Sequence, residues 1–304
     1  MPLNTTMTLP VQYVPVSQTR NLEQLVAGRC SCSSTGVKLK RVLTQCLQRR
    51  LDPFLMFDAF GRDAQNVCRE EVADHPHCGH EIVTYMIAGR MRFRDHAGRE
   101  STLEPGGVQW LTAGCGVIHT EIPQQEDGVM EGFQFWLNVP GPDKTAASKS
   151  CDFAAEDLVR FTTSAGVRVT VIAGESHGVK GAVTREATAP LILDLQLPAG
   201  SRFEQKLPKD HNAFIFTYRG SVTIAGQEVP AHNMGILAND PQSDGVVIEA
   251  AVDARVLLLA GRPLKEPIAQ YGAFVMNTQK EIYQALSDYR CGRLGQTPAE
   301  TSGT

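Results

Sequence analysis

The chain has 304 residues, of which 42% are hydrophobic and 20% are charged, an ordinary composition for a globular protein. Its length suits about two domains of roughly 100–200 residues each. The formal net charge of −4 excludes the strongly basic surface that attracts nucleic acid or an anionic membrane. We therefore expect no direct nucleic-acid partner.

The N-terminal segment and the cysteines favour an intracellular protein. Residues 1–19 contain no Lys or Arg and no continuous apolar run, so they lack the pattern of a signal peptide. The eight cysteines show no regular pairing, and disulfide frameworks are typical of short secreted chains. Residues 256–260 are apolar but far shorter than the roughly 20 residues that cross a membrane. We expect a cytoplasmic protein with reduced thiols and no membrane partner, or a nuclear protein if the source is eukaryotic.

Most of the chain has the pattern of short β-strands. Apolar or alternating runs are separated by Gly, Pro, Asn and Asp, which interrupt strands. In chain order the predicted strands are 81–87, 91–94, 107–111, 132–138, 167–172, 191–197, 213–218, 221–224 and 255–260. Many short strands of this kind predict an all-β fold of barrels or sandwiches.

A break in this pattern and an internal repeat suggest two similar halves. Residues 138–144, Asn-Val-Pro-Gly-Pro-Asp-Lys, interrupt the strands and predict a domain boundary. On each side a strand, a turn glycine and a second strand follow one another, around Gly89 and around Gly220. These two glycines are 131 positions apart, and such a repeat points to a duplicated barrel.

One short α-helix is expected near the C-terminus. Thr278-x-x-Glu281 is a capping-box pattern, which marks the start of a helix. The apolar side chains that follow recur at the spacing of an amphipathic helix, at Ile282, Ala285, Leu286 and Tyr289. The small and polar residues 291–304 predict a flexible tail.

Two pairs of polar residues carry the chemistry. His75-Pro-His77 directs two imidazoles to one face of a strand, because positions i and i+2 point the same way. His119-Thr-Glu121 does the same with an imidazole and a carboxylate. Three imidazoles and one carboxylate suit Fe(II), Mn(II), Ni(II), Cu(II) or Zn(II). A single strand histidine is usually structural, but two such pairs at barrel spacing favour one metal site with open coordination positions.

At these residues the chain resembles the pirin family of the cupin superfamily. Residues 74–85, DHPHCGHEIVTY, are similar to the pirin signature HPHRGFETVTY. Residues 105–121, PGGVQWLTAGCGVIHTE, are similar to PGDVQWMTAGRGILHSE. Residues 131–138 and 261–278 also resemble family segments, so the resemblance covers most of the chain.

The resemblance implies two tandem cupin (jelly-roll) barrels: a metal-binding barrel at 11–138 and a barrel at 145–290 that ends in the helix. It implies one divalent ion per chain, Fe(II) above all, held by His75, His77, His119 and Glu121. Glu81 also matches a family position, and we expect it to orient a ligand histidine; the alternative is a barrel-wall carboxylate with backbone donors. The second barrel contains His211 and His232, but neither belongs to such a pair, and we expect no metal there.

Three positions depart from the family pattern. The family has Arg where this chain has Cys78 and Cys115, and Phe where it has His80. Two lost cations predict weaker binding of an anionic substrate, and we expect two thiols near the pocket mouth that a nearby cation would make reactive. His80 is three residues from His77, an odd offset that faces the other side of a strand. We expect it not to be a ligand, the alternatives being an extra ligand or a proton shuttle.

Two functions follow from the resemblance. The first is a quercetin 2,3-dioxygenase-like enzyme that opens the ring of quercetin-type flavonols with O₂, with Glu121 as the base for the 3-hydroxyl proton. The alternative is a non-enzymatic, iron- and redox-dependent regulator that binds a transcription factor or a metabolic enzyme. Open coordination positions favour the enzyme, although a fold alone does not decide between these roles.

Overall fold

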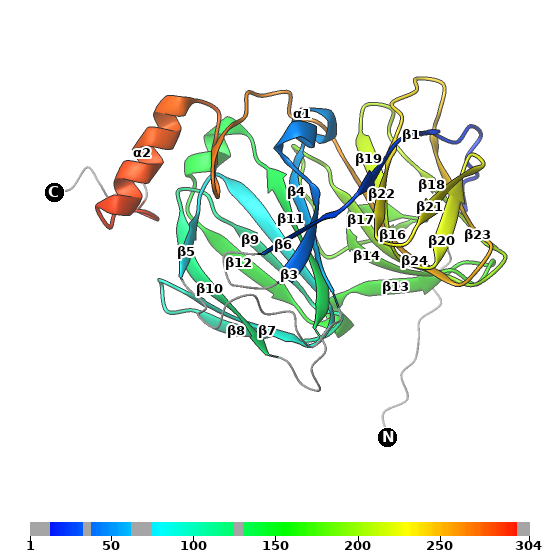
Figure 1. Cartoon of the computed structure of the whole chain (residues 1–304), viewed down its shortest axis with the longest axis horizontal. Helices are drawn as coiled ribbons and strands as arrows, with labels where there is room; N and C mark the ends of the chain where they lie inside the picture. The colour runs from blue at the N-terminus through cyan, green and yellow to red at the C-terminus, as the bar shows by residue number, and fades with distance from the viewer. Residues whose placement is uncertain (1–12, 33–37, 62–73, 125–129, 297–304) are drawn as a thin grey trace. The chain divides into compact units, whose positions relative to one another are not determined.

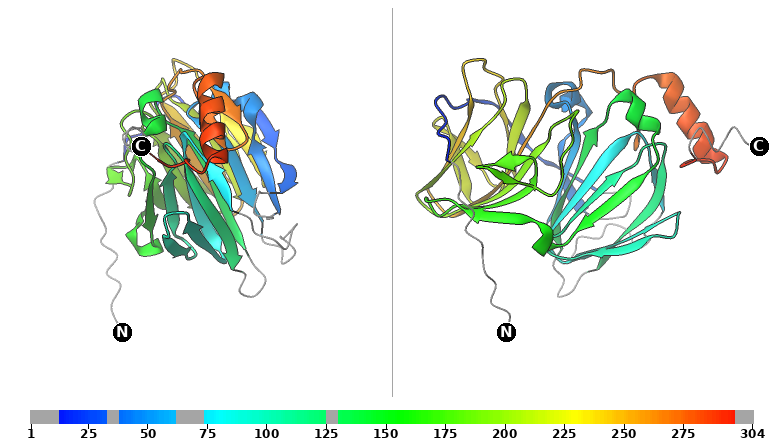
Figure 2. Two further views of the ribbon diagram at one scale, coloured as in Figure 1. Left: turned by 90° about the vertical axis from the view of Figure 1, so that its left-hand side faces the viewer. Right: turned by 180° about the vertical axis from the view of Figure 1, so that it is seen from behind.

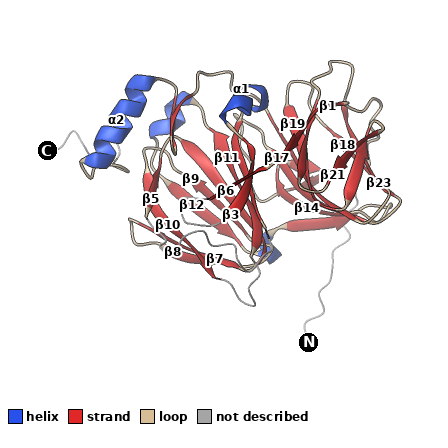
Figure 3. Ribbon diagram, viewed as in Figure 1, coloured by secondary structure: helices blue, strands red, loops and turns tan. Residues whose placement is uncertain are grey.

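The structure is a computed structural model that describes residues 13–32, 38–61, 74–124 and 130–296. Strands dominate it (red in Figure 3), which confirms the predicted all-β class. Every strand predicted from the sequence is present, with each end within one residue of the expected position. Among the described residues, no helix is both long enough and apolar enough to cross a membrane.

The chain divides into two compact units. Each unit contains one continuous middle part of the chain and the terminal segment that is farther from it in sequence. Among the described residues, the first barrel comprises those within 28–156 and 263–296, and the second barrel comprises 13–27 and 157–262. This division differs from the domain boundaries expected from the sequence, which were 11–138 and 145–290. The N-terminal segment belongs to the second barrel, and the C-terminal helix belongs to the first.

The first barrel is built from a larger and a smaller antiparallel sheet. The larger sheet has the order β12-β9-β6-β11-β4-β3-β2, with bounds Lys149–Phe153, Val108–Thr112, His80–Ala88, Glu131–Asn138, Phe54–Phe60, Lys38–Leu43 and Arg29–Cys32. The smaller sheet has the order β5-β10-β7-β8, with bounds His75–His77, Val117–Gln124, Arg90–Asp95 and Glu100–Leu103.

The second barrel contains two sheets of the same kind. The larger sheet has the order β1-β22-β19-β24-β17-β14-β13, with bounds Leu22–Ala27, Asn233–Leu237, Asn212–Arg219, Ala254–Gly261, Leu191–Leu197, Arg168–Ala173 and Val159–Thr162. The smaller has the order β18-β23-β20-β21, with bounds Ser201–Lys206, Gly245–Ala250, Ser221–Ile224 and Gln227–Pro230. Figure 1 shows β1, in blue, beside β22. A strand from the start of the chain therefore completes this barrel.

The two barrels repeat one arrangement. In each larger sheet a central strand, β6 or β19, lies between two long neighbours, β9 and β11 or β22 and β24. Each central strand ends at a turn glycine in the left-handed region, Gly89 with φ +71° and Gly220 with φ +63°. Glycine adopts this region without the steric cost of a Cβ atom. The internal repeat predicted from the sequence is therefore confirmed.

The two barrels differ in how their interiors are filled. One continuous cluster of buried apolar side chains, from Phe161 to Ala260, fills the second barrel. In the first barrel the buried apolar side chains form separate clusters, one that includes Met86 and another that includes Ile82. Polar side chains such as His119 and Glu121 are also buried there. The first barrel therefore has room for polar chemistry that the second interior lacks.

After Gly261 the chain returns to the first barrel. The hairpin β25–β26, Ala269–Tyr271 and Phe274–Met276, packs against helix α2, Gln279–Arg290. Figure 2 shows this orange and red segment beside the strands of the first barrel. Helix α2 has the complete Thr278–Glu281 capping box, which confirms the predicted helix.

The remaining elements are short. They are η1 at Gln45–Leu47, α1 at Gln48–Leu51, η2 at Gly141–Thr145, η3 at Ala155–Asp157, and the hairpin β15–β16 at Glu175–Ser176 and Val179–Lys180. The predicted tail begins as packed structure, because Leu294 is buried in a cluster with Phe274. Residues 297–304 of that tail lie outside the described residues.

Candidate metal centre

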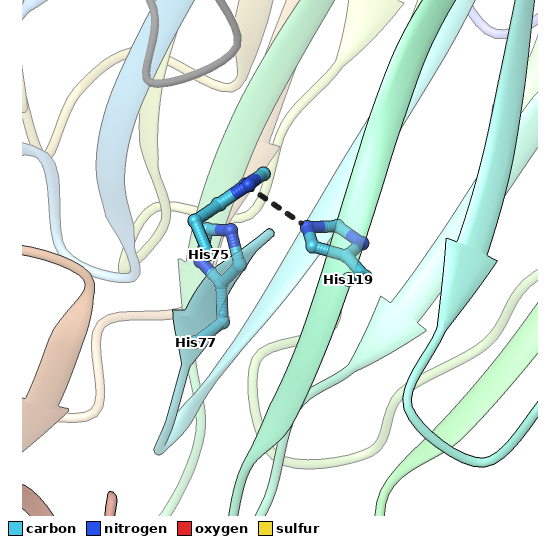
Figure 4. Close-up of side chains that lie close together, drawn as sticks. All are labelled: His75, His77 and His119. Atoms are coloured by element: carbon cyan, nitrogen blue, oxygen red, sulfur yellow. Dashed lines mark hydrogen bonds between the residues drawn. The ribbon is translucent and has the colours of Figure 1, made fainter. Parts of the chain in front are cut away.

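Three histidine side chains meet in the first barrel (Figure 4). His75 and His77 lie on β5, and His119 lies on β10 directly opposite His75 in the antiparallel register. The three ring centroids are 4.6 to 4.9 Å apart. One nitrogen of each ring lies within 4.8 Å of the corresponding atoms of the other two. The strand geometry thus brings together three of the four ligands predicted from the sequence.

The surroundings keep these imidazoles in the form that binds a metal. Burial lowers the pKa of His77 well below its ordinary value and lowers the pKa of His119 to about 3, so both rings are neutral. The Nε2 atoms of His75 and His119 are 3.2 Å apart. Both ring nitrogens of His77 are buried without a hydrogen-bond partner among the described residues. Because such atoms are costly to leave unpaired, this donor set fits a divalent first-row ion.

The fourth predicted ligand, Glu121, lies two residues after His119 on β10 and is 6% exposed. Its Oε1 accepts a 2.7 Å hydrogen bond from Gln134 Nε2. Burial raises the pKa of Glu121 to about 7, and the hydrogen bond from Gln134 acts in the opposite direction. The close group of nitrogens does not include the Glu121 oxygens. The carboxylate nevertheless lines the same cavity as His75 and His77.

A cavity of about 620 Å³ adjoins the histidines. Its walls combine apolar and aromatic side chains with amides and one ion pair: Leu43, Leu55, Met56, Trp136 and Phe274; Gln48, Gln134 and Gln270; Arg41 and Asp58. Arg41 donates from Nε and Nη2 to the two Asp58 oxygens at 2.8 and 2.6 Å. A largely apolar wall with a few fixed polar groups is typical of a small-molecule site.

The C-terminal hairpin supplies part of this wall. Residues 270–274 line the cavity, and Gln48 Nε2 donates to Gln270 Oε1 at 2.6 Å and to the Leu55 carbonyl at 2.9 Å. The sequence analysis identified none of these wall residues. Gln134 and Trp136 could have been found from the two-residue alternation of their strand. The sequence of the β25–β26 hairpin contains no local pattern that predicts a cavity wall. Its place in the wall depends on contacts with residues far away in the sequence, such as Gln48.

His80 lies beside the histidine group but outside it. Its Nδ1–H donates to the Cys78 carbonyl at 3.1 Å, and its ring centroid is 4.5 Å from that of Trp136 and 5.4 Å from that of His77. Burial lowers the pKa of His80 to about 3. The structure therefore places a neutral, buried ring next to His77.

Glu81 lies on β6 and is 2% exposed. Its Oε1 accepts a 2.9 Å hydrogen bond from Thr112 Oγ1 on the neighbouring strand β9. Glu81 is not among the residues that line the cavity. This hydrogen bond joins two strands of the larger sheet.

The two cysteines that replace family arginines do not line the cavity. Cys78 is 1% exposed, its Sγ donates to the Gly114 carbonyl at 3.4 Å, and burial raises its pKa to about 12. The expectation of a reactive thiol is therefore wrong for Cys78. Cys115 is half-buried and is not disulfide-bonded. Among the described residues, the cation that lines the cavity is Arg41. The loss of the two family arginines therefore removes no charge from the described cavity wall.

Cys32 also lines the cavity, and it is disulfide-bonded. The expectation that every thiol is reduced is therefore wrong. The other cysteines in the described part of the chain form no disulfide: Cys30, Cys46, Cys78, Cys115, Cys151 and Cys291. Spacing could not reveal the bond, because disulfide connectivity is set by the fold and not by the sequence interval.

Comparison with known proteins identifies the family. The Pirin model matches residues 36–137, and the model of the pirin C-terminal cupin domain matches residues 192–295. A Pseudomonas aeruginosa protein provisionally named a quercetin 2,3-dioxygenase is 44% identical over 279 residues, which is 90% of this chain and 98% of that protein. Human pirin is 36% identical over 286 residues, 91% of this chain and 94% of that protein.

A solved structure agrees with these matches. The crystal structure of a quercetin 2,3-dioxygenase from Acinetobacter baumannii has a TM-score of 0.82 at 28% identity, over 91% of this chain and 99% of that one. The two predicted cupin domains are thereby confirmed. Since the family models and the relatives together cover most of its length, the chain belongs to the pirin family.

Proposed function

We propose that this chain is a metal-dependent dioxygenase that cleaves quercetin-type flavonols with O₂. One divalent ion, Fe(II), would be held by His75, His77, His119 and Glu121. The observation that carries the proposal is the cavity of about 620 Å³, because it is lined by His75 and His77 as well as by apolar walls. The Pseudomonas and Acinetobacter relatives carry the name of this activity.

The four proposed ligands have different chemical roles. His77 and His119 offer neutral nitrogen donors, His75 adds a third imidazole, and Glu121 adds a carboxylate. The bound ion would act as a Lewis acid toward a substrate oxygen and orient the substrate. The buried positions of His77 and His119, at 2% and 3% exposure, exclude water from this side of the site.

Glu121 has the properties of the base for the 3-hydroxyl proton. Gln134 donates to its Oε1, which leaves Oε2 for the ion or for the proton. Burial raises the pKa of Glu121 to about 7, so an oxygen of this carboxylate that does not bind the ion can accept a proton near neutral pH. The hydrogen bond from Gln134 also fixes the orientation of the Glu121 carboxylate.

The walls suit a flat aromatic molecule with several hydroxyl groups. Trp136, Phe274 and Met56 offer apolar surface, and Asp58, 2% exposed, can accept a hydrogen bond from a phenol. Tyr271, at the hairpin, is 63% exposed and lines the same cavity. An aromatic side chain there can pack against a ligand that enters from solvent.

The test follows flavonol absorbance and carbon monoxide release under air with iron-loaded protein. We expect carbon monoxide to appear as flavonol is consumed, and neither change in chelator-treated protein or in His119→Ala. Gln134→Leu keeps the three histidines but removes the donor to Glu121. We expect it to lower kcat by about 10–100-fold, as is typical when a partner of a ligand is removed.

Glu249→Gln, an exposed carboxylate of the second barrel, is a matched control that should retain full activity. Iron-loaded protein that releases no carbon monoxide from a panel of flavonols would contradict the proposal. That result would favour the non-enzymatic regulator of a transcription factor or metabolic enzyme.

A further inference from the structure

The second barrel has a cavity of its own, of about 530 Å³. It lies where β17 and β19 begin and β24 ends, and these three ends are neighbours in the sheet. Its lining comes from residues 174–175, 180, 184–186, 189–191, 205–208, 211 and 262. Because the interior of this barrel is filled by apolar side chains, the cavity is confined to the mouth.

This mouth corresponds to the end of the first barrel that carries the histidines. His80 begins β6, and His211 directly precedes β19, the strand that takes the place of β6 in the second barrel. These two histidines are 131 positions apart, like the two turn glycines. Strand β18, which corresponds to β5, ends in Gln205 and Lys206 in place of a histidine pair. The corresponding strands at this end of the two barrels therefore carry different side chains: two histidines on β5, and Gln205 and Lys206 on β18.

The lining of the second mouth has an excess of positive charge. Four cations, Lys180, Arg185, Lys206 and Arg262, stand against two acids, Glu175 and Glu186. Asp244 pairs with Lys206, and Asp210 lies 3.8 Å from Arg262, so these acids compensate part of the charge. The lining residues alone carry two more positive than negative charges, and Asp244 and Asp210, outside the lining, offset that excess.

A buried imidazole forms part of the same wall. His211 is 5% exposed, and its Nδ1 is buried with no hydrogen-bond partner among the described residues. Burial, aided by Arg262 and Arg20, lowers the pKa of His211, although Asp210 opposes this. The ring is therefore neutral near pH 7 and can both donate and accept a hydrogen bond.

The backbone around this imidazole is held in place. Arg20 is fully buried and donates from Nη1 to the His211 carbonyl and from Nη2 to the Pro208 carbonyl, both at 2.7 Å. Nη1 also lies 3.3 Å from Asn239 Oδ1. A rigid wall that presents an unpaired polar group next to a cavity is a preorganised binding surface.

We propose that the mouth of the second barrel binds a small organic carboxylate with an apolar body. The carboxylate would lie between Lys180 and Arg262, near His211. The apolar body would lie against Pro190, Leu191 and Leu207, which line the same cavity. This site is independent of the metal centre and of the activity proposed there.

The test is calorimetric titration of the full-length, metal-loaded protein with benzoate at low ionic strength. Benzyl alcohol tests the need for charge, and inorganic phosphate tests the need for an apolar body. We expect saturable benzoate binding in the millimolar range, and much weaker binding of both comparison compounds. Binding should survive metal removal by a chelator, because the metal lies in the other barrel.

Two charge variants locate the site. Lys180→Gln and Arg262→Gln remove exposed or half-exposed cations, and each should weaken benzoate binding about tenfold, the effect of one charge-assisted contact. Arg168→Gln, an exposed cation of the same barrel outside the cavity, should leave it unchanged.

His211→Phe keeps a ring but removes its nitrogens, and it should also weaken binding. No saturable binding, loss of binding with the metal, equal weakening by Arg168→Gln, or equal binding of phosphate would each overturn the proposal.

Discussion

The two barrels share one strand order, yet they are filled in opposite ways. In the second barrel, alternate residues of β17, from Leu191 to Leu197, are all leucines of one core cluster. In the first barrel, alternate residues of β10 are His119 and Glu121. The hydrogen-bond ladder of a sheet does not depend on which side chains point inward. A duplicated fold can therefore keep one barrel as a packed core and use the other for chemistry.

At corresponding ends of the two barrels, a buried cationic side chain donates hydrogen bonds to backbone carbonyls. Lys144 is 2% exposed and donates to the Gly79 carbonyl, just before β6, at 2.8 Å and to Oδ1 of Asn138, the last residue of β11, at 2.5 Å. Arg20 holds the segment before β19 in the second barrel in a similar way. In each barrel a buried cation fixes the loop that leads into the central strand. In the first barrel that loop follows β5, the strand that carries His75 and His77.

The largest expected effect tests whether the metal belongs to the first barrel alone. Four-ligand structural zinc sites bind with about 10–16 kcal/mol, so one ligand corresponds to about 3–4 kcal/mol. We expect His119→Ala to weaken metal binding by about 100- to 1,000-fold. Elemental analysis of purified protein should show one ion per chain in the parent.

His232→Asn is the matched change in the second barrel. His232 is exposed with φ +64°, a conformation that Asn tolerates. This variant should keep one ion per chain. Two ions per chain in the parent, or full occupancy in His119→Ala, would contradict a metal site confined to the first barrel.

Removal of the buried cations should destabilise each barrel separately. Lys144→Met and Arg20→Met leave buried carbonyls without donors, and we expect each to lower the free energy of unfolding of its own barrel by about 2–3 kcal/mol. Amide hydrogen exchange, followed by mass spectrometry on peptides of each barrel, measures this change in the free energy of unfolding. Protection lost equally in both barrels would show that they unfold as one cooperative unit.

Lys144 predicts a pH dependence in the first barrel. Burial lowers its pKa from 10.5 to about 8. Between these values the unfolded chain keeps a proton that the folded chain has lost, so stability contributed by this group rises with pH. We expect a rise of about 1–3 kcal/mol from pH 8 to pH 10.5 in the parent, and its absence in Lys144→Met. An identical pH profile for the two proteins would show that Lys144 titrates normally.

The smallest expected effect concerns the helix that the C-terminal segment adds to the first barrel. Thr278→Ala removes the side-chain acceptor for Glu281 N and should cost about 1 kcal/mol. Exchange of the amides of α2 should accelerate, while protection in the second barrel stays unchanged. Thr278→Ser, which keeps the hydroxyl, is the control and should behave like the parent.

The features that depend on local periodicity could be predicted from the amino-acid sequence alone. The two-residue period of a strand placed His75 and His77 on one face, and the structure brings them to His119. The capping box located helix α2, and the turn glycines Gly89 and Gly220 revealed the repeat. These features follow from a few neighbouring residues, whose backbone geometry is the same in any fold.

Which distant segments meet could be seen only in the folded chain. It assigned the two chain ends to opposite barrels, and it completed the cavity with residues 270–274. It also buried Cys78, which raises the pKa of that thiol and makes it unreactive. Burial and cavity walls arise from contacts between residues far apart in the chain. No local pattern records such contacts, because their free energy depends on the packed environment and not on sequence spacing.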